Sequence, residues 1–276
     1  MTWLSLIFGG IVGLSLGLTG GGGAIFAVPL LVYGLGVAPR EAVGISLAAV
    51  GVTAFVGFLG RWRTKQVEIR TGLVFAVAGM LGAPVGSWLS GLIPETVLLA
   101  LFAGLMLIVA LRMWSKAAAT MNAGASLVCS TEELDNDGPT CRRDRNGNLL
   151  LTSKCAWLLM AVGVVTGVLS GLFGVGGGFV IVPALVLFSG MAIHRAVGTS
   201  LLVIALVSIS GIASYLFSGR TISVETTVWF VFGGVAGMFL GNLAGRRLSG
   251  SVLQQVFAVA IVAVAVFVIV RTVFQQ

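Results

Sequence analysis

Residues 17–29 read GLTGGGGAIFAVP and residues 171–183 read GLFGVGGGFVIVP, so one glycine-rich pattern occurs twice, 154 residues apart. Each copy lies inside an apolar stretch that is too long for one ordinary membrane span. The first stretch, Thr2–Gly36, would form a straight helix of about 50 Å, whereas the hydrocarbon core of a bilayer is about 30 Å thick. Because glycine runs weaken helices and permit unusual backbone angles, we expect two shorter helices joined at the glycines in each stretch. The alternative is a kinked helix on the surface.

The composition around these motifs excludes a water-soluble protein. Of 276 residues only 25 are charged, 16 basic and 9 acidic, and 58% are apolar. The mean hydropathy is +1.10. Soluble domains carry about 25% charged residues, and neither a disordered chain nor a disulfide scaffold has this composition. What remains is a polytopic membrane protein.

Charged residues are absent from eight long blocks, four on each side of a polar middle. The blocks are Thr2–Pro39, Ala42–Gly60, Thr71–Pro94, Thr96–Leu111, Cys155–Ile193, Ala196–Gly219, Thr226–Gly245 and Leu248–Val270. They are too long for outer-membrane barrel strands and lack the alternation of such strands. They predict an all-α protein of two four-segment halves, in which the first block is a retained span and not a signal peptide.

The polar middle divides the chain into a first transmembrane repeat (1–115), a cytoplasmic linker (116–154) and a second transmembrane repeat (155–276). All three cysteines lie in or beside this linker, at Cys129, Cys141 and Cys155. Their spacings match no C-x-x-C pair and no zinc pattern. We therefore expect free thiols, with no metal and no cofactor.

Two further patches match between the halves. Ala42–Leu47 and Ala196–Leu201 both read Ala-Val-Gly-x-Ser-Leu at the offset of 154. A third patch matches at an offset of 159: Gly82, Gly86, Leu89, Ser90 and Gly91 correspond to Gly241, Gly245, Leu248, Ser249 and Gly250. Three patches in the same order indicate a duplication, hence two homologous repeats.

Small-residue ladders run through both halves at a spacing of four residues. They comprise Gly9, Gly13, Gly17 and Gly21; Gly163, Gly167 and Gly171; and Gly233, Gly237, Gly241 and Gly245. On a helix such residues share one face and let two backbones approach closely in lipid. We expect these ladders to pack helices together. Asn242, in an otherwise apolar run, is a candidate for hydrogen bonding across helices.

The paired glycine breaks indicate a binding site for an anion. A helix that begins inside the membrane leaves four N–H groups without partners and carries about half a positive charge at that end. An anion placed there satisfies both. We expect half-helices to start near Ala24 and Phe179 and to hold one anion near the membrane midplane. Interrupted helices in corresponding positions of two halves favour a secondary transporter.

The duplicated motifs resemble those of the TauE/SafE family, also called the sulfite-exporter or TSUP family. The resemblance rests on Gly20–Gly23 with Val28-Pro29, on Gly174–Gly178 with Val182-Pro183, and on the Ala-Val-Gly-x-Ser-Leu patch after each. It covers residues 4–114 and 156–272 but not the central linker. It implies a multi-pass transporter in a bacterial-type cytoplasmic membrane. Its substrate would be a sulfur-containing anion such as sulfite, thiosulfate or an organosulfonate.

The expected substrate ligands are the motif glycines and the hydroxyl residues near them. They are Thr19, Gly20, Gly21, Gly22, Gly23, Ser46, Gly174, Gly176, Gly177, Gly178, Thr199 and Ser200. Ser46 and Ser200 occupy matching positions, where a buried hydroxyl can donate to an oxyanion; the alternative is a local bond to the helix backbone. His194, the only histidine, matches Arg40, and both are candidates for a gate or for proton coupling. A structural role is the alternative for the histidine.

The orientation of the two repeats depends on how each glycine-broken block crosses the membrane. Arg61, Arg63, Lys65 and Arg70 cluster in one loop, which the positive-inside rule places in the cytoplasm. If each block crosses once, the halves are parallel; if each re-enters as a hairpin, the halves are inverted. We favour inverted repeats, because the adjacent pair Arg246-Arg247 then also lies inside.

Other functions are less consistent with the sequence. No G-x-x-x-x-G-K-[ST] motif occurs, which argues against an ATP-driven pump. Gly13–Gly17 spells the G-x-S-x-G of serine hydrolases, but it lies in an apolar helix and His194 is the only potential base. A passive anion channel stays open as an alternative. The net charge of +7 reflects positive-inside placement, and the expected partners are a small anion and the bilayer, not nucleic acid.

Overall fold

The computed structural model describes residues 2–63, 67–94, 153–174 and 193–245, with short pieces between 97 and 105 and between 178 and 191. All the regular structure in these residues is helical, as expected. The elements are α1 (Thr2–Thr19), η1 (Gly22–Phe26), α2 (Ala27–Pro29), η2 (Leu30–Gly34), α3 (Pro39–Trp62), α4 (Ile69–Leu92), α6 (Ser153–Phe173), α8 (Ile193–Phe217) and α9 (Val224–Gly245). Five of them, α3, α4, α6, α8 and α9, are long and apolar enough to span a membrane. The blocks expected over 96–111 and 248–270 lie largely outside the described residues.

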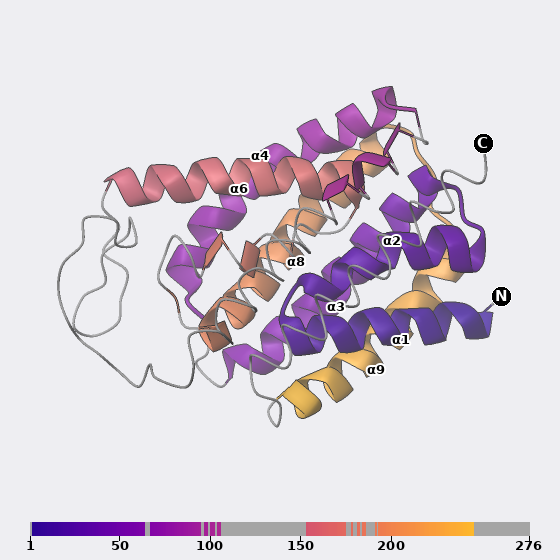
Figure 1. Ribbon diagram of the computed structural model, residues 1–276, viewed down its shortest axis with the longest axis horizontal. Helices are drawn as coiled ribbons and strands as arrows, with labels where there is room; N and C mark the ends of the chain where they lie inside the picture. The colour runs from indigo at the N-terminus through magenta and orange to yellow at the C-terminus, as the bar shows by residue number, and fades with distance from the viewer. Residues whose placement is uncertain are drawn as a thin grey trace, which may run out of the picture.

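The first apolar block is a helical hairpin. α1 ends at Thr19, and the chain re-enters helix at Gly22, with η1, α2 and η2 forming one short apolar helical run up to Gly34. Gly23 lies against Leu16, whereas Gly34 lies against Phe8, so the returning run passes back along α1. Figure 1 shows the chain turning at the end of α1 and returning toward the side where the chain begins. The expected division of this block into two shorter helices is therefore present.

α1 and α9 pack closely along the first glycine ladder. A Cβ atom at Gly9 would overlap the backbone of Phe230, and one at Gly13 would overlap the backbone of Gly234. Residue numbers rise together along the two helices, so α1 and α9 run parallel. Glycine is required here because the two backbones are in direct contact.

α4 and α6 repeat this arrangement elsewhere in the molecule. A Cβ atom at Gly167 would overlap the backbone of Gly79, and one at Gly171 would overlap the backbone of Ala83. These helices also run parallel. The ladders thus pack the first helix of each half against a helix from the other half of the chain.

α3 and α8 form the centre of the helix bundle. In their apolar spans 72% of the residues are buried, compared with 50% or less in α4, α6 and α9. Gly44 lies against Tyr215, and Gly51 lies against Ser208, so these two helices run antiparallel. In Figure 1, α3 begins at the end of the molecule where α4 and α8 finish.

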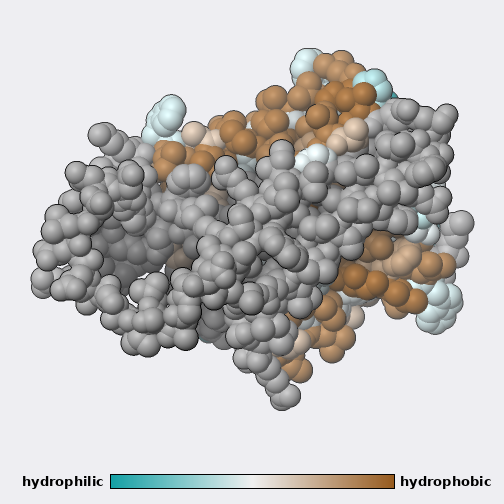
Figure 2. Space-filling view, viewed as in Figure 1, coloured by the Kyte–Doolittle hydropathy of each residue, from teal (hydrophilic) through white to brown (hydrophobic). Residues whose placement is uncertain are grey.

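The outer faces of the helices are apolar. Trp88 is 64% exposed and Leu81 is 70% exposed on α4, and Phe239 on α9 is 63% exposed. In Figure 2 apolar side chains cover the upper edge, over α4, and the lower right, over α1 and α9. Large exposed apolar surfaces of this kind are typical of contact with lipid.

The expectation of free thiols is wrong for one cysteine. Cys155 is fully buried near the start of α6 and is disulfide-bonded. The sequence carries no spacing that identifies such a bond, because disulfide geometry depends on the distance between Cα atoms in the fold. Cys129 and Cys141 lie outside the described residues.

Replacing Gly13 by alanine is expected to destabilise the protein by about 1–3 kcal/mol, because the new methyl group overfills the contact with Gly234. Gly10→Ala on the same helix is the matched control: its nearest neighbour would be the carbonyl oxygen of Gly233 at 3.8 Å. Since alanine favours helix over glycine, the control is expected to unfold at the wild-type temperature or above it. Thermal unfolding in detergent, followed by tryptophan fluorescence, measures both, and equal midpoints for the two variants would contradict the packing.

Candidate functional site

The two glycine-rich breaks lie in contact with each other. A Cβ atom at Gly21 would collide with the backbone of Gly178, and one at Gly178 would collide with Gly21. These residues are 157 positions apart in the chain. Gly176 and Gly177, also expected as ligands, lie outside the described residues. The fold therefore brings the two motifs together, as a shared site requires.

Gly20 and Gly174 end α1 and α6 in the same way. Their φ angles are +75° and +69°, and each donates its N–H to the carbonyl four residues earlier, that of Leu16 at 2.7 Å and that of Ser170 at 2.9 Å. Left-handed backbone of this kind costs other residues about 1–2 kcal/mol. Glycine at these two positions is therefore the local reason why both helices stop where they do.

The helical run that starts at Gly22 begins inside the protein without a side-chain cap. Residues Gly22–Phe26 are all buried, and no side chain caps the N-cap residue Gly21. The first N–H groups of a helix have no partners within the helix and carry its positive dipole end. In this turn the N–H of Ala24 bonds to the carbonyl of Gly21 at 3.3 Å. The binding of an anion by the N–H groups before it stays a prediction.

The matched serines Ser46 and Ser200 differ in their hydrogen bonds. Both are fully buried. The hydroxyl of Ser200 lies within hydrogen-bonding distance of two carbonyl oxygens, those of Gly20 and, at 2.9 Å, Val197. The hydroxyl of Ser46 has no partner among the described residues. One hydroxyl of the pair therefore supports a break, and the other is an unused donor.

Ser46 lies close to the second break. Val43, one helical turn before Ser46, contacts Gly174, just as Val197, one turn before Ser200, contacts Gly20. Residues three apart on a helix share a face. The unused hydroxyl is therefore on the face of α3 that meets Gly174.

The two threonines make contacts with the backbone. Thr19 donates from Oγ1 to the carbonyl of Ser15 at 2.7 Å. Thr199 accepts at Oγ1 from the N–H of Glu68 at 3.0 Å, which ties the start of α4 to the start of α8. These contacts account for the positions of both side chains, and a role as anion ligands stays a prediction.

Arg40 and His194 lie far from each other, although they match in the sequence. Each is in the first turn of its helix, α3 or α8, and these helices are antiparallel, so the two residues lie at opposite ends of the pair. Arg40 donates from Nη2 to the carbonyls of Gly91 at 3.5 Å and Ile93 at 3.4 Å. The side chain of His194 lies outside the described residues. A role of either residue in a gate or in proton coupling stays a prediction.

Arg61 is a residue of this region that the sequence did not single out as a site. It donates to Oδ1 of Asn242 from Nε at 3.2 Å and from Nη2 at 2.9 Å, and to the carbonyl of Gly17 at 3.2 Å. The expected cross-helix bond of Asn242 is thereby confirmed. The contact ties α1, α3 and α9 together three residues before Gly20. In the sequence only Asn242, a polar residue in an apolar run, pointed to this contact.

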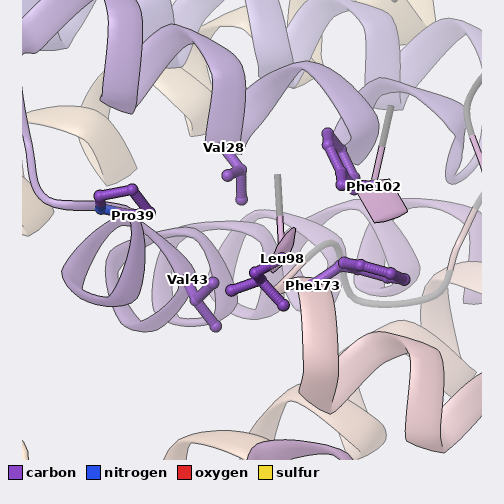
Figure 3. Close-up of a pocket in the computed structure, with 6 residues that line it drawn as sticks. All are labelled: Val28, Pro39, Val43, Leu98, Phe102 and Phe173. Carbon is purple, nitrogen blue, oxygen red and sulfur yellow. The ribbon is translucent and has the colours of Figure 1, made fainter. Parts of the chain in front are cut away.

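A small apolar cavity lies beside the second break. Its volume is about 10 Å³, close to that of one water-sized sphere. Figure 3 shows the six side chains that line it: Val28, Pro39, Val43, Leu98, Phe102 and Phe173. Val43 also contacts Gly174. Because the lining is apolar, this cavity alone offers no ligand to an anion.

The G-x-S-x-G sequence at Gly13–Gly17 lies within α1, where its glycines pack on α9. A hydrolase needs this motif on a strand-to-helix turn, so that the serine is exposed to substrate. The motif here serves helix packing.

Comparison with known proteins gives consistent results along the whole chain. A family model described as sulfite exporter TauE/SafE matches residues 5–268. A probable membrane transporter protein of Xylella fastidiosa is 37% identical over 282 residues, which cover 99% of this chain and 98% of that protein. The probable membrane transporter protein YunE of Bacillus subtilis is 26% identical, over 99% of this chain and 100% of its own length. A probable membrane transporter protein of Methanocaldococcus jannaschii is 28% identical, over 77% of this chain and 72% of its length. No solved structure matches.

Proposed function

Because this chain belongs to the TauE/SafE family of sulfite exporters, we propose that it is a secondary transporter that moves a small sulfur-containing anion across the cytoplasmic membrane. Its similarity to probable membrane transporter proteins and its membrane-spanning helices identify it as a multi-pass membrane transporter and not an enzyme. Sulfite, thiosulfate and organosulfonates are the substrates that we propose, and each presents several oxygen acceptors.

The contact between the two glycine breaks is the observation that carries this proposal. Gly21 and Gly178 touch, and the run that starts at Gly22 has no side-chain cap. In this proposal the free N–H groups and the dipole of that run hold the anion near the midplane. Glycines without side chains let the anion approach the backbone directly.

Ser46 is the side chain that we propose as a further donor to the anion. Its hydroxyl is fully buried and has no partner among the described residues. A buried donor without an acceptor is destabilising by about 1–3 kcal/mol, and a bound anion removes that penalty. Ser200 has a different role in this proposal, since its hydroxyl is engaged by the Gly20 carbonyl and holds the break in shape.

We further propose that the repeats, 1–115 and 155–276, are inverted. α3 and α8 match at an offset of 154 residues and run antiparallel. Related helices are antiparallel when the symmetry axis lies in the membrane plane and parallel when it lies along the membrane normal. The hairpin return of Gly22–Gly34 also supports inversion, because a re-entrant first block makes the number of crossings odd.

The distribution of arginine residues between the two ends of the bundle also supports inverted repeats. One end of the helix bundle carries Arg61, Arg63, Arg70 and Arg195, while the other carries Arg40 and Arg220. The positive-inside rule assigns the first end to the cytoplasm. In this proposal the linker 116–154 follows on the cytoplasmic side.

Transport against a gradient separates a transporter from the alternative of a passive anion channel. Proteoliposomes containing the purified protein are expected to take up ³⁵S-labelled sulfite or thiosulfate beyond equilibrium when a proton gradient is imposed. Empty liposomes are the control. Uptake that always stops at equilibrium would indicate a channel, and absence of flux for every sulfur anion tested would contradict the proposed substrate class.

Ser46→Ala is expected to lower the apparent affinity for the anion at least tenfold, because a hydrogen bond to a charged group is worth about 1.5–3 kcal/mol. Ser208→Ala is the matched control. Ser208 is also fully buried and without a partner among the described residues, but it lies against Gly51 in the α3–α8 contact. The concentration of anion that gives half-maximal flux measures both. A wild-type value for Ser46→Ala would remove this serine from the site.

Single cysteines placed on the exposed residues Ser218 and Arg63 test the orientation of the repeats. Inverted repeats place Ser218→Cys outside and Arg63→Cys inside, so a membrane-impermeant maleimide should label only the first in intact cells. The Arg63→Cys protein should react after permeabilisation, and the unmodified chain gives the background from its own cysteines. Parallel repeats place both positions in the cytoplasm, so failure to label Ser218→Cys from outside would support that arrangement.

A further inference from the structure

A further duplicated motif lies near the C-terminal ends of the two central helices. Phe58–Arg61 reads Phe-Leu-Gly-Arg and Phe217–Arg220 reads Phe-Ser-Gly-Arg, at an offset of 159 residues. Because α3 and α8 are antiparallel, the two arginines lie at opposite ends of the molecule. Arg61 finds a side-chain acceptor there in Asn242. Arg220 has a different environment.

Arg220 extends over the last turns of α4. It donates from Nη2 to the carbonyl of Ser87 at 3.4 Å, and its guanidinium carbon lies 5.3 Å from the ring centre of Tyr215. A Cβ atom at Gly91 would overlap Nη2 of this arginine, so glycine at that position provides the room for the guanidinium. The second terminal nitrogen, Nη1, is buried and has no partner among the described residues.

Two unused hydroxyls lie in the same turns of α4. Ser87 is 2% exposed and Ser90 is fully buried, and neither Oγ has a hydrogen-bond partner among the described residues. Ser87 and Gly91 are four residues apart and share a helix face, and Ser90 is three residues from Ser87. Arg220 covers that face. A guanidinium nitrogen of Arg220 and the hydroxyls of two serines within one turn of α4 are therefore buried without a partner among the described residues.

A second cation borders this place. Arg40 reaches the carbonyls of Gly91 and Ile93, so both guanidinium groups meet the end of α4. The neighbouring acid Glu41 accepts from the N–H of Ser223 at 3.1 Å. Among the described residues, the charged groups at this end of α4 are thus Arg40, Arg220 and Glu41.

Capping of α4 explains only part of this arrangement. Arginines near the C-terminal end of a helix stabilise its last carbonyls and its dipole, which accounts for the bonds of Arg40 and Arg220 to the backbone. It does not account for Nη1 of Arg220 or for the two serine hydroxyls. Buried donors are normally paired, and the residues that the structure describes supply no acceptor for these three.

We propose that Arg220, Ser87 and Ser90, with Arg40 beside them, form an oxyanion-binding site at the external end of the transport path. A guanidinium donates to two oxygens of one anion in a plane, and the hydroxyls supply further donors. This inference rests on the proposed function, because it assigns the site to the transported sulfur oxyanion before it reaches, or after it leaves, the glycine breaks. It also gives a role to Ser90 and Gly91, which recur as Ser249 and Gly250 in the second half of the chain. In this proposal Ser90 is a ligand, and Gly91 makes room for the arginine.

The test compares Arg220→Gln, Arg220→Lys and the double variant Ser87→Ala with Ser90→Ala. Right-side-out and inside-out membrane vesicles, supplied with ³⁵S-labelled sulfite or thiosulfate, separate the two faces. Arg220→Gln and the double serine variant are expected to raise the half-saturating external concentration about tenfold, with maximal flux nearly unchanged, because charge-assisted bonds are lost. Arg220→Lys retains the charge and is expected to recover part of the affinity.

The exposed Arg195, at the other end of the bundle, provides the control. Arg195→Gln removes the same charge and is expected to leave the external half-saturating concentration unchanged. A wild-type concentration dependence in Arg220→Gln and the double serine variant would overturn the site while leaving transport itself intact. A lowered maximal flux and melting temperature without a change in half-saturation would show that Arg220 only caps α4. Absence of flux in the wild type would instead contradict the proposed function.

Discussion

A helix that stops inside a membrane leaves backbone N–H and C=O groups that lipid cannot satisfy, so protein must cover the interruption. In this chain two helices stop in this way, and each interruption is covered in part by the other. Gly21 and Gly178 touch, and the carbonyl of Gly20 accepts a hydrogen bond from Ser200 of α8. Each break therefore depends on residues from the opposite half of the chain. The absence of side chains at these glycines permits this contact, and the proposed binding of a small anion depends on the same feature.

The glycine ladders make this mutual cover geometrically possible. Lipid tails are as apolar as leucine side chains, so membrane helices associate through close van der Waals contact. α1 packs on α9, and α6 packs on α4, each pair through backbone contact at glycine. Both pairs join helices from different halves, while α3 and α8 cross antiparallel at the centre. The halves are thus interlocked, and the ends of α1 and α6 are directed toward one another.

Duplicated residues do not perform duplicated roles in this molecule. Ser200 is bonded at one break, whereas its counterpart Ser46 is buried and finds no partner in the part of the chain that the structure describes. Arg61 donates to Asn242, whereas Arg220 donates to the Ser87 carbonyl and its Nη1 has no partner among the described residues. A transporter must bind its substrate from two different sides, and a duplicated scaffold with different polar contacts at its two ends provides that difference in a symmetric framework.

The sequence by itself determined the features that depend on composition and on local backbone preference. Few charges and long apolar blocks required membrane helices, and the run at Gly20–Gly23 required α1 to stop, because glycine tolerates the positive φ found at Gly20. The ladders and Asn242 also showed that helices would approach closely. Only the tertiary structure decided which helices meet, that Ser46 is buried with no partner among the residues described, that Cys155 is in a disulfide, and that Arg61 reaches Gly17. Such contacts join residues far apart in the chain, so they are set by the relative placement of whole helices, and no local pattern around either residue contains that information.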